Sequence, residues 1–252
     1  MERRFEKEIE SLKTTLIKMG SVVEDNLSMA IQSLFEEKIE LAKKIVDGDE
    51  RINSLEIEID NAVVDILALK QPVATDLRLI LAVQKINNDL ERIGDHAVNI
   101  AESAVELIRT PANEPLLEIP RMADITKAML RHALDSFILV DPQLARSVLE
   151  RDDQIDKLNR EMTKKVIGLI KSDARTVESG MDLIRISRNL ERVADLTTNI
   201  AEEVIFLTQA RIVKHHAEEK SKAPPTDIPP PGIPTPDKLT GILFSEFIPI
   251  SP

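Results

Sequence analysis

Apolar residues recur along the chain at intervals of three and four, which is the spacing of one side of an α-helix. This pattern predicts a long helix from about Arg4 to Glu37 and a second from about Ile39 to Leu69. Pro72 then marks a turn, because proline suits the start of a helix and not its interior. The third helix has the most regular pattern, a narrow apolar seam typical of packing against neighbouring helices: Ile86, Leu90, Ile93, Ala97, Ile100, Ala104 and Leu107.

The pattern starts again in the second half of the chain. Residues 109–120, RTPANEPLLEIP, hold three prolines and are typical of a linker. Helices are predicted after it over residues 122–140, 142–171 and 176–213. The segment DGDERINSLEIE from Asp47 aligns with ERDDQIDKLNRE from Glu150, which indicates an internal repeat.

The predicted fold is therefore all-α, with two tandem antiparallel three-helix bundles related by the internal repeat. We expect the first bundle over residues 1–110, a linker over 111–120 and the second bundle over 121–214. Residues 215–252 are rich in proline, and we expect a disordered, polyproline-prone tail there.

Composition narrows the class of protein further. The 252 residues are 42% hydrophobic but only 2% aromatic, so the core must be aliphatic, which suits helix packing. The net charge of −11 argues against a nucleic-acid partner. There is no cysteine, no signal-peptide core and no apolar run long enough to span a bilayer. We expect a cytoplasmic protein.

One motif occurs twice, at a spacing of 100 residues. NDLERIGDHAVNIAE (88–102) recurs as RNLERVADLTTNIAE (188–202), with eight of fifteen positions identical. On a helix, three acids of each copy point away from the apolar seam and form an outward acidic stripe. Like charges four residues apart repel by a few tenths of a kcal/mol. The stripe therefore calls for a counter-charge, either a neighbouring arginine or a bound cation. The acids are Glu91, Asp95 and Glu102 in the first copy, and Glu191, Asp195 and Glu202 in the second.

The middle helix of each bundle has its own pair of polar residues at the same spacing. These pairs are Asp49 with Asn53, and Asp152 with Asp156. In an antiparallel hairpin they lie level with the doubled motif, because they are equally far from the predicted turns. Four oxygen-bearing side chains at one level predict a site for Mg, Mn, Fe or Zn ions. Asp49 flanks the apolar side of its helix, so convergence of the two pairs can require a partner or a second chain.

These residues resemble those of the PhoU family of phosphate-uptake regulators. The resemblance rests on tandem bundles that each contain Glu-Arg-hydrophobic-(Gly/Ala)-Asp followed by Asn-Ile-Ala-Glu, and on QPVATDLRLI at residues 71–80. It covers about residues 5–213 and both repeats, but not the proline-rich tail. Asn53 departs from the pattern, since the second repeat has Asp156 there and an amide is a weaker ligand than a carboxylate.

The resemblance implies a cytoplasmic, homodimeric regulator that is not an enzyme. Proteins of this family restrain the high-affinity phosphate ABC transporter and keep its sensor histidine kinase quiet when phosphate is plentiful. The implied partners are thus the transporter's ATPase subunit and the kinase. The protein is expected to associate with the membrane only through these partners. The family carries multinuclear metal clusters on the motifs. The implied ligands here, for Fe, Zn, Mn or Mg, are Glu91, Asp95, Glu191 and Asp195, supported by Asp49, Asn53, Asp152 and Asp156.

Two alternatives belong to other classes. A metal-free helical scaffold or spacer predicts acidic stripes that tolerate substitution freely. A ferritin-like carboxylate metalloenzyme needs inward-facing acids and Glu-x-x-His pairs, and the sequence contains no Glu-x-x-His. The sequence also has no phosphate-binding glycine loop and no nucleophile beside a base, so catalysis is not expected.

Overall fold

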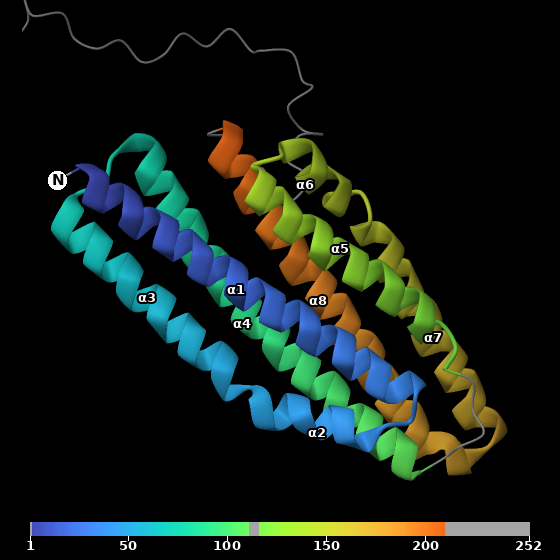
Figure 1. Ribbon diagram of the computed structural model, residues 1–252. Helices are drawn as coiled ribbons and strands as arrows, with labels where there is room; N and C mark the ends of the chain where they lie inside the picture. The colour runs from blue at the N-terminus through green and yellow to red at the C-terminus, as the bar shows by residue number, and fades with distance from the viewer. Residues whose placement is uncertain (1, 111–115, 210–252) are drawn as a thin grey trace, which may run out of the picture. The chain divides into compact units, whose positions relative to one another are not determined.

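The computed structural model describes residues 2–110 and 116–209, and every regular element in these ranges is a helix. The first repeat contains α1 (Glu2–Phe35), α2 (Ile39–Gly48), α3 (Glu50–Lys70) and α4 (Ala74–Arg109). The second contains α5 (Ile119–Leu139), α6 (Pro142–Leu149), α7 (Asp152–Ser172), the short 3₁₀ helix η1 (Ala174–Thr176) and α8 (Val177–Gln209). The prediction of an all-α fold built from an internal repeat is confirmed (Figure 1).

The continuity of the middle helix was predicted wrongly in both repeats. The helix expected from Ile39 to Leu69 is divided into α2 and α3, and the helix expected from Pro142 is divided into α6 and α7. In the first repeat α2 ends at Gly48, a poor helix former. In the second, the Arg151 N–H donates to the Val148 carbonyl, three residues back. This tighter spacing interrupts the α-helical ladder.

Local sequence explains where several helices begin and end. Pro142 occupies the first turn of α6, where its missing N–H costs nothing, and the Asp141 carboxylate accepts hydrogen bonds from the Gln143 and Leu144 N–H groups at 2.8 and 3.2 Å. In the first repeat, Gln71 closes α3 in the left-handed conformation with φ of 49°. The turn predicted around Pro72 is therefore present.

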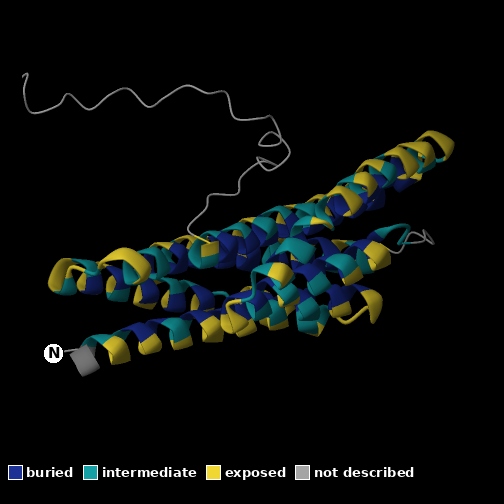
Figure 2. Cartoon of the chain, turned by 90° about the horizontal axis from the view of Figure 1, so that it is seen from above, coloured by how far each residue is buried: buried dark blue, intermediate teal, exposed yellow. Residues whose placement is uncertain are grey.

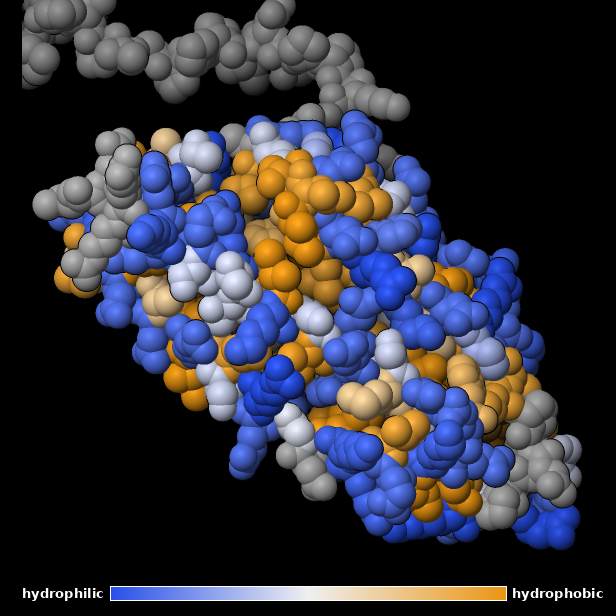
Figure 3. Space-filling view, in the orientation of Figure 1, coloured by the Kyte–Doolittle hydropathy of each residue, from blue (hydrophilic) through white to orange (hydrophobic). Residues whose placement is uncertain are grey.

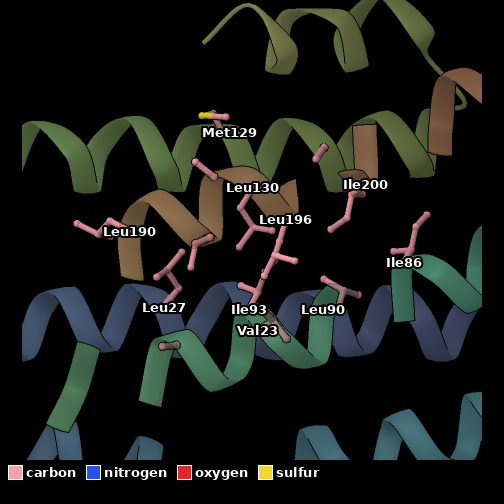
Figure 4. Close-up of a cluster of buried hydrophobic side chains, with 14 of the residues drawn as sticks. Val23, Leu27, Ile86, Leu90, Ile93, Met129, Leu130, Leu190, Leu196 and Ile200 are labelled. Atoms are coloured by element: carbon pink, nitrogen blue, oxygen red, sulfur yellow. The ribbon is translucent and has the colours of Figure 1, made fainter. Parts of the chain in front are cut away.

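The two repeats pack against each other through their long helices. α1 lies against α4, α5 lies against α8, and the antiparallel pair α4 and α8 shares the most extensive contact (Figure 1). Buried residues lie on the inner side of each helix, while exposed residues lie on the outer side (Figure 2). A single aliphatic core runs through both repeats, with side chains from α1, α4, α5 and α8 meeting at its centre (Figure 4): Val23, Leu27, Ile86, Leu90, Ile93, Met129, Leu130, Leu190, Leu196 and Ile200.

Polar side chains cross the contact between α4 and α8. The Lys85 ammonium lies 2.8 Å from the Glu203 carboxylate, and the Asn199 amide donates to Asp89 at 3.5 Å. Glu203 and Asp89 are only 6% and 9% exposed. The two repeats are thus joined by buried charged and polar groups as well as by the aliphatic core.

Parts of the predicted domain organisation lie outside the described residues. These are the linker residues 111–115, the end of the second bundle after Gln209, and the whole proline-rich tail 215–252. Within the stretch predicted as linker, Leu116 and Leu117 pack against the core and α5 already begins at Ile119. Among the described residues, no helix combines the length and apolar character that a membrane span requires.

Candidate metal centre

The second repeat brings three carboxylates together between two helices. Asp156 lies on α7, one turn from its start, and Glu191 and Asp195 lie one turn apart on α8. One ligand oxygen from each residue lies within 4.8 Å of the other two, and all three side chains are half-buried. The prediction left open whether the two acid pairs converge without a second chain. In this repeat the three carboxylates converge within one chain.

Basic side chains surround this second cluster, which we define as Asp156, Glu191 and Asp195. Arg160 lies 3.2 Å from the Asp156 carboxylate. Arg192 lies 3.5 Å from Asp195 and 3.8 Å from Glu191. The arginine counter-charge considered from the sequence is therefore present in this repeat. In the first repeat, Arg92 lies 3.8 Å from Asp89 instead.

The arginines do not cancel the unfavourable environment of the acids. Partial burial raises the pKa of Glu191, and the neighbouring Asp195 raises it further. Burial also raises the pKa of Asp195, with Asp156 adding to the effect and Arg192 opposing it. A carboxyl group with a raised pKa is destabilised in its charged form. The second cluster thus favours an additional positive charge.

The first repeat has a looser arrangement. Burial raises the pKa of Glu91, and repulsion from Asp95, Glu56 and Asp49 acts in the same direction. The pKa of Asp95 is likewise raised by burial and by Asp49. However, these ligand atoms do not approach one another as closely as those of the second cluster, which is the only such group among the described residues. The Asn53 amide donates to Asp49 at 3.2 Å and so occupies one of the carboxylate oxygens.

Glu56 belongs to the acidic group of the first repeat, and the sequence interpretation missed it. Its pKa is raised by burial, by Asp60 and by Asp95. In the repeat alignment Glu56 corresponds to Asn159, whereas Asn53 corresponds to Asp156. Each repeat therefore has one acid and one amide at these two positions, but in opposite order. The sequence could have indicated this role for Glu56, because Glu56 lies two helical turns after Asp49 and one turn after Asn53. We define the first cluster as Asp49, Glu56, Glu91 and Asp95.

His96 lies between the two clusters. Its imidazole Nδ1 lies 2.8 Å from the Asn189 side-chain oxygen on α8. Its charge lowers the pKa of both Asp95 and Asp195, although burial outweighs it in each case. The two clusters therefore lie close enough to the contact between α4 and α8 to share one histidine neighbour.

The fold thus brings together only some of the residues predicted as ligands. Asp156, Glu191 and Asp195 meet; Asp49, Glu91 and Asp95 influence one another electrostatically; and Asn53 bonds to Asp49. Asp152 lies in the first turn of α7 and is not one of the three converging groups. All donors are oxygens, and clustered carboxylates with raised pKa values suit hard or borderline cations. The second cluster fits a cation better than the first.

Fold and site together define a tandem-repeat, all-α protein whose two helical hairpins each carry an acidic cluster. The family model described as the PhoU domain matches this chain twice, over residues 16–104 and 119–204. The chain belongs to the PhoU family.

Relatives agree with this assignment over most of their length. The chain is 38% identical over 217 residues to a protein of Aquifex aeolicus called "Phosphate-specific transport system accessory protein PhoU homolog", covering 86% of this chain and 98% of the relative. It is 32% identical over 212 residues to the Escherichia coli K12 "Phosphate-specific transport system accessory protein PhoU", covering 84% and 88%.

Solved structures show the same fold. The crystal structure of PhoU from Pseudomonas aeruginosa matches with a TM-score of 0.80 at 34% identity, covering 82% of this chain and all of that one. The structure of the phosphate transport system regulatory protein PhoU from Streptococcus pneumoniae matches with a TM-score of 0.77 at 29% identity, covering 84% of this chain and all of that one.

Proposed function

We propose that this protein is a cytoplasmic, metal-binding negative regulator of high-affinity phosphate uptake and of phosphate-starvation signalling. It acts by binding the ATPase subunit of a phosphate ABC transporter and the associated sensor histidine kinase, and it works as a homodimer. Membership of the PhoU family supports the role in phosphate transport, because the relatives are named as accessory proteins of a phosphate-specific transport system.

The observation that carries the metal-binding part is the convergence of Asp156, Glu191 and Asp195 within 4.8 Å. These side chains would hold the ion in the second repeat, with Asp152 close to them along α7. Glu91, Asp95, Asp49 and Glu56 would hold an ion in the first repeat. The bound Fe, Zn, Mn or Mg ion supplies positive charge that opposes the mutual repulsion of the carboxylates.

This charge has a consequence for partner binding. The chain has a net charge of −11, and the two clusters concentrate negative charge beside the α4–α8 contact. An acidic surface repels other acidic surfaces and raises the cost of desolvation on binding. Neutralised clusters approach a membrane-bound complex at lower electrostatic cost.

Metal content tests the first part of the proposal. The protein is purified without a His-tag or chelator, and bound metal is measured by mass spectrometry. The comparison is a variant in which four acids of the doubled motif are changed to alanine: Glu91, Asp95, Glu191 and Asp195. We expect at least one Fe, Zn or Mn ion per cluster in the wild type and loss in the variant. A wild type that stays metal-free even when metal is supplied contradicts metal binding and leaves a metal-free scaffold.

Partner binding is tested separately. The transporter's ATPase subunit and the kinase's cytoplasmic part are each used to retain the protein on a column, with and without metal. We expect retention of the wild type and weaker retention of a Glu91→Lys, Asp95→Lys variant. The control variant, Asp65→Lys, changes an exposed acid on α3 outside the clusters. Equal retention of all three proteins contradicts a role for the clusters, and no retention of any contradicts the proposed partners.

A further inference from the structure

An apolar groove of about 780 Å³ lies at the end of the bundle where α1 begins and α8 ends. Its walls come from four helices, with Phe5 and Ile9 on α1, Leu79 on α4, Phe137 on α5 and Leu207 on α8. The space-filling view shows apolar side chains gathered along this groove, which is open to solvent on the side shown (Figure 3). The groove is separate from both acidic clusters, none of whose residues line it.

The groove depends on a segment that only the first repeat has. α1 has 34 residues, whereas its counterpart α5 has 21. The PhoU domain matches start at residue 16 and at residue 119, so the first turns of α1 have no equivalent at the start of α5. Those extra turns carry Phe5, Ile9 and Lys13, which line the groove. This surface therefore lies partly outside the segment that the family model matches.

Large apolar side chains at the groove are left in contact with water. Ile17 is 38% exposed, Ile138 is 48% exposed and Val140 is 54% exposed. They are grouped around one hollow, whereas single exposed apolar residues on a soluble protein are ordinary. A grouped apolar surface with a polar rim is typical of a binding site.

The rim of the groove is negatively charged. Glu6, Glu10 and Asp76 stand beside one basic residue, Lys13, and Lys13 is already paired with Glu10 at 2.9 Å. Neither Glu6 nor Asp76 forms an ion pair with a basic side chain that the structure describes. Two carboxylates thus remain for a binding partner of opposite charge.

From this geometry we infer that the groove receives an amphipathic helix from a partner protein, with aliphatic residues on one side and lysine or arginine along its edges. A helix laid in an apolar groove buries side chains spaced three and four residues apart, and an open groove between helices accepts that shape. The negative rim selects a basic segment. A second copy of this acidic chain brings charge of the same sign, so it is the less favourable occupant. The inference goes beyond the proposed function and does not depend on metal binding.

The test uses a model peptide and the full chain. The probe is a fluorescent helix of about 18 residues, five turns, built from leucine on one side and lysine on the other, with a leucine–glutamate peptide for comparison. Anisotropy is measured at physiological salt. The groove variant is Ile17→Gln with Ile138→Gln. The control is Ile57→Gln with Val64→Gln on α3, at side chains that are 59% and 63% exposed. All four positions are exposed, and circular dichroism verifies the fold of each variant.

We expect the lysine peptide to bind the wild type and the control equally, and to bind the groove variant at least tenfold more weakly. A rim variant, Glu6→Lys with Asp76→Lys, should reverse the preference toward the glutamate peptide. Equal loss in groove variant and control, or equal binding of both peptides to the wild type, overturns the inference. So does wild-type self-association in sedimentation that the groove variant abolishes, because the occupant is then a second copy.

Discussion

Replacing Asp89 by asparagine should stabilise the protein at neutral pH, although it removes the ion pair with Arg92. Asp89 is 9% exposed and lies on α4 at the contact with α8. It accepts a hydrogen bond from Asn199 at 3.5 Å, and Arg92 lies 3.8 Å away. Both distances are long, so these partners compensate little for burial. Burial raises the pKa of Asp89 from 3.8 to about 6.

The raised pKa sets the size and pH range of the effect. The folded protein holds the Asp89 proton up to about pH 6, whereas the unfolded chain releases it near pH 4. Folding therefore gains from protonation at low pH, and stability falls as pH rises through this range. A difference of about two pKa units corresponds to roughly 3 kcal/mol lost between about pH 4 and pH 6. An asparagine side chain at this position carries no charge, so the Asp89→Asn variant should escape this loss.

Urea unfolding of the metal-free protein at several pH values measures the difference between wild type and Asp89→Asn. Carboxyl groups that do not interact with Asp89 titrate equally in both proteins and cancel in the difference. We expect near equality at about pH 4 and an advantage for the variant of about 2–3 kcal/mol at pH 7. The control is Asp65→Asn, an exposed acid on α3, which should change stability by less than about 0.5 kcal/mol. A variant less stable than wild type at pH 7, or a pH-independent difference, refutes the reasoning.

Further predictions concern other buried groups and the clusters. Lys85→Met leaves the buried Glu203 carboxylate without its cation and should cost about 1–3 kcal/mol in urea unfolding, partly restored by Glu203→Gln. Ile93→Ala should cost about 2–5 kcal/mol in the same assay, because the side chain is fully buried in the central core. Asn53→Asp should increase the metal affinity of the first repeat, measured by calorimetry. Metal binding by the second cluster should weaken as pH falls, because protons compete for carboxyl groups whose pKa values are raised.

Much of the fold could be predicted because helices and the aliphatic seam have a short sequence period. The apolar residues of α4 from Ile86 to Ala104 are buried as expected, and the hairpin turn falls at Pro72. The interruptions of the middle helix at Asp49 and before Asp152 could not be predicted in the same way. They depend on a single glycine in one repeat and on local backbone hydrogen bonding in the other, which leave the apolar period unchanged.

The site was predictable only in part, for a similar reason. Counting residues from the turn placed Asp156 level with Glu191 and Asp195, and these side chains do meet. The same count could not show that Asn53 bonds to Asp49, or that Glu56 joins the first cluster. Both facts depend on side-chain direction at a broken helix. The groove near Phe5 was also missed, because it is formed by four helices that are distant in sequence.

The exchanged positions of acid and amide in the two repeats have a consequence for the proposed metal binding. Asn53 and Glu56 in the first repeat correspond to Asp156 and Asn159 in the second. The two repeats therefore have the same formal charge at these positions but a different arrangement of the acid and the amide. Under the proposed metal binding, two unlike sites would fill one after the other as the concentration of the ion rises, whereas identical sites would fill together. On that proposal, a chain with two unlike sites would respond in graded steps across a broader range of ion concentration than a chain with two identical sites.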